Sequence, residues 1–179
     1  MDLSDNQIVT AVRDGEKESF AVLVERYDTV VYNLMRRYSH SSDDAADMTR
    51  EVFCRVYEKL GRYRKQTSFF AWLYTLALNY ARDWKKKEYS QQRKLARYAE
   101  EVKMESPEIR HDPERRQETQ RMMLALEGLE EDRRELLILR YRHERSIREL
   151  AEIFKVSESA VKMRIQRSLG ELQNLLGEK

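Results

Sequence analysis

The 179-residue chain is poor in residues that interrupt helices or cross-link chains, with five glycines, two prolines and one cysteine. The single cysteine, Cys54, excludes an intrachain disulfide, and the three scattered histidines form no pair at metal-ligand spacing. Few segments alternate apolar and polar residues as a strand would. We therefore expect an all-α fold with no bound metal and no cofactor.

Long apolar runs are also missing, and no basic stretch leads into an apolar one at the start of the sequence. A membrane-spanning helix needs roughly 20 apolar residues, so we expect no direct membrane insertion. The first residues lack the pattern of a signal peptide, which favours a cytoplasmic protein. No catalytic constellation or glycine-rich phosphate loop is recognisable, so we do not expect an enzyme.

Charged residues make up 37% of the chain, yet the net charge is only +2. Residues 1–60, 61–95, 96–132 and 133–179 carry net charges of −4, +7, −5 and +4. Two basic blocks separated by an acidic one favour two anion-binding surfaces. Chance clustering on solvated helices is the alternative that charge alone leaves open.

Capping residues and apolar periodicity predict four helices in the first half of the chain. Ser4 and Gln7 form a capping box for a short first helix. The second, third and fourth helices are expected at about 19–38, 43–60 and 69–87, with Ser68 as the cap of the fourth. The apolar stripes of the second and fourth helices consist of Phe20, Leu23, Val24, Tyr27, Val31 and Leu34, and of Phe69, Trp72, Leu73, Leu76, Ala77 and Tyr80.

Residues 91–120 contain both prolines, few strongly apolar residues and much charge, which is typical of a flexible linker. A short helical piece near 95–102 is compatible with this pattern. The linker divides the chain into a larger domain, 1–90, and a smaller one, 121–179.

The smaller domain is predicted to hold short helices at 122–129 and 133–143, followed by two helices in quick succession. Ser146 and Glu149 form a capping box for the first of these, and Ser157 caps the second, which continues to about residue 176. This pattern resembles a helix-turn-helix, with an ordinary amphipathic hairpin as the alternative. Lys155 occupies the turn position that is usually glycine, and a left-handed lysine costs roughly 1 kcal/mol. The turn either tolerates this cost or differs slightly in shape.

The last helix is predicted to place apolar residues, among them Val161 and Ile165, on one side. Ser159, Lys162, Met163 and Gln166 are expected on the opposite side, with Arg164 and Arg167 on the flanks. A polar, basic face near a helix N-terminus suits reading of the DNA major groove.

Two sets of motifs resemble the sigma-70 family of transcription initiation factors. The C-terminal segments 129–141 and 159–165 resemble region 4, while 44–53, 68–74, Asn79 and Asp83 resemble region 2. The order of the two sets, with a linker between them and no other region, is similar to the extracytoplasmic-function (ECF, group IV) subfamily. The resemblance implies two small helical domains, a region 2 bundle and a region 4 helix-turn-helix.

For the larger domain, the resemblance implies contacts with core RNA polymerase and with the −10 promoter element. The polymerase-binding positions are Asp44, Asp47, Arg50, Glu51, Val52 and Tyr57. The −10 positions are Arg62, Tyr63, Arg64, Lys65, Ser68, Phe69, Asn79, Arg82 and Lys86, with Tyr63 or Phe69 as candidates for stacking on a base. Arg50 departs from the family pattern, which has glutamine there.

For the smaller domain, the resemblance implies reading of the −35 promoter element through Ser157, Ser159, Lys162, Met163, Arg164, Gln166 and Arg167. The partners implied are the largest-subunit clamp and the beta flap of polymerase, promoter DNA, and an anti-sigma factor that can hold the protein at the membrane. Two rival functions are a DNA-binding regulator without polymerase contact and a decoy that only binds other proteins.

Overall fold

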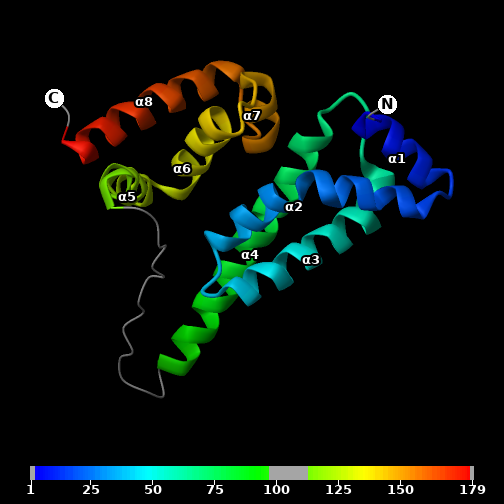
Figure 1. The fold of residues 1–179 in the computed structure, drawn as a ribbon, viewed down its shortest axis with the longest axis horizontal. Coiled ribbons are helices and arrows are strands. Elements are labelled where there is room, and N and C mark those ends of the chain that lie inside the picture. Colours follow the sequence, from blue (N-terminus) through cyan, green and yellow to red (C-terminus); the bar gives the residue numbers. More distant parts are fainter. Residues whose placement is uncertain (1–2, 97–112, 178–179) are drawn as a thin grey trace. The chain divides into compact units, whose positions relative to one another are not determined.

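The computed structural model describes residues 3–96 and 113–177, and within these ranges the chain forms helices and turns but no strand. The prediction of an all-α fold is thus confirmed. The chain divides into two compact units, Met1–Pro107 and Glu108–Lys179 (Figure 1). The boundary between them lies within the segment that the sequence assigns to a linker.

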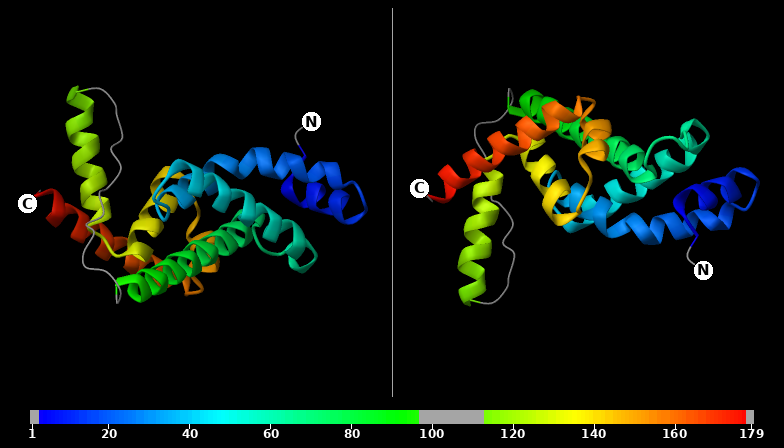
Figure 2. Two further views of the ribbon diagram at one scale, coloured as in Figure 1. Left: turned by 90° about the horizontal axis from the view of Figure 1, so that it is seen from below. Right: turned by 90° about the horizontal axis from the view of Figure 1, so that it is seen from above.

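In the described part of unit 1, residues 3–96, the chain forms four helices and two short 3₁₀ turns. Their bounds are α1 Asp5–Arg13, η1 Lys17–Ser19, α2 Phe20–Arg36, α3 Ser42–Lys59, η2 Leu60–Arg62 and α4 Phe69–Ala96. Helices α2 and α3 are antiparallel neighbours, α4 packs against both, and α1 packs against α2 (Figures 1 and 2).

Side-chain caps define where these helices begin. The Ser4 hydroxyl accepts a hydrogen bond from the Gln7 N–H at 3.4 Å, and Gln7 Oε1 accepts one from the Ser4 N–H at 2.8 Å, so the predicted capping box is confirmed. Ser41 caps α3 by accepting from the Asp44 N–H at 3.0 Å. Ser68 accepts from the Ala71 N–H at 3.4 Å, as expected for the cap of α4.

Helix α4 differs from its prediction in two respects. It continues to Ala96 instead of ending near residue 87, since residues 88–96 are mostly good helix formers, and the rest of the short helix expected near 95–102 lies outside the described residues. Its buried side also includes Phe70, Tyr74 and Leu78, whereas Trp72 is only half-buried. Because α4 contacts both α2 and α3, its buried surface is wider than a single stripe.

The loop between η2 and α4 is held by an arginine from α1. Arg13 Nη2 donates to the carbonyl oxygens of Leu60 and Tyr63, at 2.5 and 2.6 Å. The Tyr63 hydroxyl lies 2.8 Å from both Asn6 Oδ1 and the Thr67 carbonyl oxygen. Helix α1 therefore fixes the shape of a segment about 50 residues further along the chain.

Unit 2 is built on the long last helix. Its elements are α5 Pro113–Glu127, α6 Glu131–Leu137, the π-helical turn η3 Ile138–Arg142, α7 Ile147–Phe154 and α8 Glu158–Leu176. Helices α5, α6 and α7 each contact α8, and Leu139, Leu150 and Val161 are fully buried at their shared core. An ion pair between Arg133 and Glu171 joins α6 to α8.

The turn between α7 and α8 tolerates a left-handed lysine at position 155. This residue adopts a left-handed conformation, with φ 54° and ψ 47°, and its N–H donates to the Ala151 carbonyl. Ser146 and Glu149 form the predicted capping box of α7, and Ser157 caps α8 by accepting from the Ala160 N–H at 3.2 Å. The turn thus accepts a lysine where glycine would fit without strain.

Replacement of Arg13 by alanine should loosen the loop between η2 and α4. Two carbonyl groups lose a charged donor, so we expect a loss of about 1–3 kcal/mol in the free energy of unfolding. Amide hydrogen exchange of residues 61–67 should accelerate, and the neighbouring Arg62→Ala variant, whose side chain is exposed, should leave it unchanged. Unaltered protection of the loop in Arg13→Ala would contradict the anchoring role.

The Lys155→Gly substitution should stabilise unit 2, because glycine adopts a left-handed conformation without the Cβ clash. We expect a gain of about 1 kcal/mol, measured from the exchange of the slowest amides of α7 and α8. In contrast, Lys162→Gly lies in regular helix and should cost about 1 kcal/mol. A loss of stability in Lys155→Gly would show that the lysine side chain itself supports the turn.

Candidate nucleic-acid interfaces

The exposed face of α3 carries charges of both signs. Asp47 pairs with Arg50 one turn later, and Glu51 Oε1 accepts from Arg55 Nε at 2.7 Å. Asp44 accepts from the Ser41 hydroxyl at 2.7 Å, so its carboxylate is fixed near the helix N-terminus. This face presents carboxylates whose positions are set by neighbouring donors, and it suits the polar part of a protein interface.

Arg55 links this face to α4, a connection not foreseen from the sequence. Its guanidinium lies 4.5 Å from the ring centroid of Tyr80, within the range of a cation–π contact. Burial raises the pKa of the Tyr80 hydroxyl, and Glu51 and Asp47 raise it further, against the lowering effect of Arg55. The four-residue spacing of Glu51 and Arg55 was the sequence signal that could have revealed part of this network.

Two of the predicted polymerase-binding positions lie differently from the others. Val52 is 1% exposed and belongs to the core of unit 1, so it supports the face from beneath instead of forming part of its surface. The expectation that Val52 touches a partner is corrected on this ground. Tyr57 remains 39% exposed, and its ring meets Phe20 of α2 edge-on at 5.1 Å between centroids.

Exposed cations surround the loop between η2 and α4. Arg62, Arg64 and Lys65 are all exposed, and a shallow hollow beside them is lined by Arg13, Tyr63, Arg64, Lys65, Gln66 and Thr67. On α4, Asn79, Arg82 and Lys86 follow each other at helical spacing along one face, with Asn79 and Lys86 exposed and Arg82 half-buried. The loop and α4 together form a basic surface, as the charge distribution indicates.

Tyr63 and Phe69, expected to stack on a base, are each only 3% exposed. Their rings meet edge-on at 5.4 Å between centroids, and both also contact Trp72, at 5.4 and 5.8 Å. Neither ring is open to a nucleotide in this structure, because each supports the loop from inside. Tyr63 and Phe69 therefore form the buried core beneath the loop, and neither ring presents a stacking surface in this structure. Ser68 is half-buried, and its hydroxyl accepts the hydrogen bond from the Ala71 N–H that caps α4.

In unit 2, the exposed side of α8 carries the predicted reading residues. Lys162, Arg164, Gln166 and Arg167 are exposed, and Met163 is 54% exposed despite its apolar character. The Ser157 and Ser159 hydroxyls lie 2.9 Å apart at the N-terminus of the helix. Val161 and Ile165 are buried on the other side, so the helix has a packed face and an open, basic one.

Hydrogen bonds also fix the segment that leads into α7, and no pattern in the sequence predicted them. Arg140 Nη1 donates to the Arg145 carbonyl at 2.9 Å, and Arg145 Nε donates to the His143 carbonyl at 2.7 Å. Glu144, between them, has a left-handed backbone with φ 52°. These bonds hold the start of the helix-turn-helix against the π-helical turn.

Among residues 3–96 and 113–177, no group of three or more His, Cys, Asp and Glu side chains is placed to hold a metal ion. None of the helices in these ranges combines the length and the apolar content that a bilayer crossing requires.

Comparison with known families matches both units. Residues 23–91 match Sigma-70 region 2, and residues 119–172 match Sigma-70, region 4. The RNA polymerase sigma factor CarQ of Myxococcus xanthus is 30% identical over 167 residues, which cover 93% of this chain and 94% of CarQ.

Other relatives match over a shorter stretch. The ECF RNA polymerase sigma-E factor of Escherichia coli K12 is 35% identical over 82 residues, or 46% of this chain and 42% of that protein. The RNA polymerase sigma-H factor of Pseudomonas aeruginosa is 35% identical over 79 residues, or 44% of this chain and 41% of its own length. These two matches therefore span less than half of each relative.

Solved structures share the fold. CnrH, determined in complex with the cytosolic domain of CnrY, is 23% identical and superimposes with a TM-score of 0.68 over 95% of each chain. The sigma factor RpoE of Bartonella quintana, determined in complex with the anti-sigma factor NepR, is 26% identical with a TM-score of 0.59, over 86% of this chain and 96% of that chain. With both regions matched in order and CarQ similar over nearly its whole length, the chain belongs to the sigma-70 family of RNA polymerase sigma factors, as a member of the extracytoplasmic-function type.

Proposed function

We propose that the chain binds core RNA polymerase through unit 1 and directs it to promoters that both units read. The observation that carries this proposal is the presence of two different basic surfaces, one in each unit. Unit 1 offers flexible cationic side chains around a fixed loop, and unit 2 offers a helix with an open basic face. The surface of unit 1 suits a single DNA strand separated from its complement, and the surface of unit 2 suits the major groove of an intact duplex.

In unit 1, Arg62, Arg64 and Lys65 would hold the phosphates of the melted −10 strand. The loop backbone is fixed by Arg13, so these cations extend from a rigid base. Asn79, Arg82 and Lys86 continue the track along α4. With Tyr63 and Phe69 buried, specificity in this region would rest on polar groups and on the hollow beside the loop.

In unit 2, the N-terminal half of α8 would enter the major groove at the −35 element. Lys162, Met163 and Gln166 are exposed and could reach base edges, together with Ser159 near the helix start. Arg164 and Arg167 would hold phosphates, which position the helix without reading sequence. The positive end of the helix dipole at Ser157 favours a phosphate nearby.

Polymerase would dock on the exposed face of α3, with the largest-subunit clamp as the contact and the beta flap meeting unit 2. Asp44, Asp47, Arg50 and Glu51 supply the polar contacts, and Tyr57 supplies exposed ring surface. An anti-sigma factor is a further proposed partner, since the relative from Bartonella quintana was determined with one. A cytoplasmic location, with tethering to the membrane through such a partner, fits this proposal.

A regulator that binds DNA without polymerase is the second candidate, because the helix-turn-helix alone would serve it. A decoy that only binds proteins is the third. Runoff transcription with core polymerase, with and without the full chain, separates the proposed function from these two. Only the proposed function gives promoter-directed transcripts that require the chain.

The double variant Asp47→Ala/Glu51→Ala should weaken the binding of core polymerase by roughly tenfold or more, because two interface carboxylates are removed. Binding of the free chain to a promoter duplex should stay unchanged, since these residues are on α3. Affinity measured with labelled core polymerase is the readout, and Asp14→Ala, an exposed carboxylate at the end of α1, is the control. Equal affinity of variant and wild type would exclude the α3 face as the dock.

The Lys162→Ala variant should lower promoter-specific initiation while it leaves polymerase binding intact. A lost contact to a base edge is worth about 1–3 kcal/mol, or roughly 5- to 150-fold in promoter affinity. Lys162→Arg should recover part of the activity, because it keeps the charge and the donors. Runoff yields that are equal for Lys162→Ala and wild type would remove Lys162 from the reading surface.

A further inference from the structure

The face of α8 that we assign to the −35 element has an apolar residue at its centre. Successive residues of an α-helix are turned by about 100°, so Val161 and Ile165, two positions before and after Met163, lie about 200° away from it in opposite senses. Val161 and Ile165 are buried against the rest of unit 2, whereas Met163 is 54% exposed. The side chain of Met163 therefore points directly away from the packed side of the helix.

The exposed side chains around Met163 are all polar or charged. Those within one turn of it on the same face are Ser159, Lys162, Gln166 and Arg167. Of the large apolar side chains that are exposed among the described residues, Met163 is the one in the N-terminal half of α8. A single exposed apolar residue is common on protein surfaces, but this one lies where the proposed contact with DNA would be deepest.

The major-groove edges of the base pairs present a single apolar group, the C5-methyl of thymine, beside hydrogen-bond donors and acceptors. A thioether is only a weak acceptor and has no donor. Against a polar edge, Met163 would displace water without replacing its hydrogen bonds, which costs free energy. Against a thymine methyl, both groups bury apolar surface, and the flexible methionine side chain adapts to the position of the methyl.

We propose that Met163 contacts the C5-methyl group of a thymine in the −35 element and so sets a preference for thymine at one position. This inference rests on the proposed function, in which α8 enters the major groove, and goes beyond it by naming the base and the group that is recognised. Lys162 and Gln166 carry hydrogen-bond donors, which suit guanine and adenine edges. Met163 is thus the contact of this face that depends on a methyl group.

The selection experiment uses the full chain with core polymerase and a pool of short DNA duplexes that carry a randomised segment. One pool contains thymine, and a second contains uracil, which pairs in the same way but lacks the methyl group. Wild type should enrich thymine at one position of the first pool and should lose that preference alone in the second. Met163→Ala should lose the same preference in the thymine pool, whereas Met163→Leu, which keeps a large apolar side chain, should retain it.

Affinity for the selected duplex measures the size of the effect. Uracil at that one position should weaken the binding of wild type by roughly fourfold, which corresponds to one buried methyl group. For Met163→Ala, the thymine and uracil duplexes should bind within about 1.5-fold of each other, since the methyl group has lost its partner. Cytosine at the same position should bind wild type more tightly when it carries a C5-methyl group, and this gain should be absent in Met163→Ala.

Met123→Ala is the matched control. It removes the same side chain from α5, where Met123 is 41% exposed and lies outside the exposed face of α8. This variant should keep both the thymine preference and the fourfold effect of uracil. Circular dichroism checks that the variants fold, which we expect because both methionines are exposed and alanine is a good helix former.

Equal binding of thymine and uracil duplexes by wild type at every selected position would overturn the proposal. A uracil effect of the same size in Met163→Ala would also overturn it, because the methyl group would then contact another residue. Weaker binding of core polymerase by Met163→Ala, with the thymine preference intact, would assign the exposed side chain to a protein contact and against the methyl group.

Failure of the methyl contact can be told apart from failure of the proposed function. If wild type enriches a sequence but does not respond to the loss of thymine methyl groups, the methyl contact fails and the proposed function stands. If no sequence is enriched and core polymerase gives no transcript that requires the chain, the proposed function fails and the methyl contact fails with it.

Discussion

Four aromatic rings at the junction of α2, α4 and the loop before α4 organise the loop that carries the exposed cations of unit 1. Tyr63 of the loop packs against Phe69 and Trp72 of α4, and Phe69 also meets Tyr27 of α2, at 5.8 Å between centroids. Edge-on and tilted contacts of this kind add to the gain from burying large apolar surfaces. Arg13 then closes the loop from the outside by binding two of its carbonyl groups. The aromatic side chains are buried beneath the loop, whereas the cationic side chains of Arg62, Arg64 and Lys65 are exposed on it.

Unit 2 obtains its functional surface in another way, from local backbone geometry. Two serine caps and a left-handed lysine set the path of the chain from α7 into α8, and buried Leu150 and Val161 fix the two helices against each other. The capping bonds satisfy amide groups at the helix starts that would otherwise lack partners. The apolar side of α8 packs against α5, α6 and α7, and the opposite, basic side of the helix is therefore exposed.

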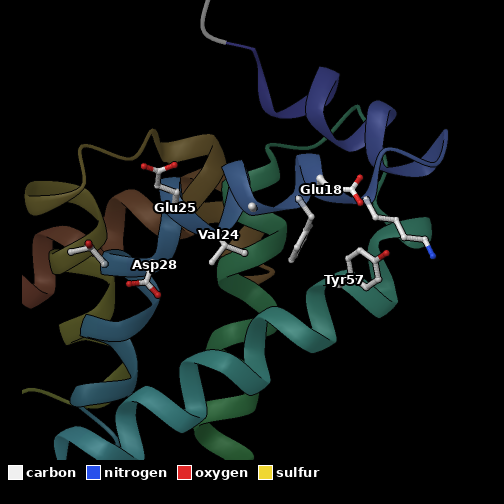
Figure 3. A pocket seen from close by; sticks show the side chains of 9 residues that line it. Glu18, Val24, Glu25, Asp28 and Tyr57 are labelled. Carbon is white, nitrogen blue, oxygen red and sulfur yellow. The ribbon is translucent and has the colours of Figure 1, made fainter.

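The two acidic surfaces of unit 1 differ in how their charges are balanced. Asp47 and Glu51 on α3 each pair with an arginine, so the face offers both donors and acceptors at fixed positions. Glu18, Glu25 and Asp28, on η1 and α2 (Figure 3), form no ion pair among the described residues and lie beside half-buried Phe20 and Val24. A balanced face suits a partner with mixed charge, whereas an unbalanced one favours a cationic partner.

The sequence by itself determined most of the helices, their caps, the helix-turn-helix and the family, because each depends on residues within a few positions of one another. It assigned the end of α4 and the start of α5 to the linker, and both are helical in the structure. A capping box spans three residues, and an apolar stripe repeats every three or four. The same patterns identified the exposed charges on α3, in the loop and on α8. The place of Lys155 in the turn left two alternatives open, and the structure shows the left-handed one.

Only the tertiary structure decided which of the candidate residues face outward. Val52, Tyr63 and Phe69 carry side chains that fit either a surface or a core, and neighbours from other helices buried them. The partner of the Tyr63 hydroxyl in α1 is 57 residues away, and no local pattern connects the two. Phe20 and Val24 are only half-buried, since no helix in the described part of unit 1 covers them fully. Burial depends on the packing of whole helices, and for that reason short-range patterns could not settle it.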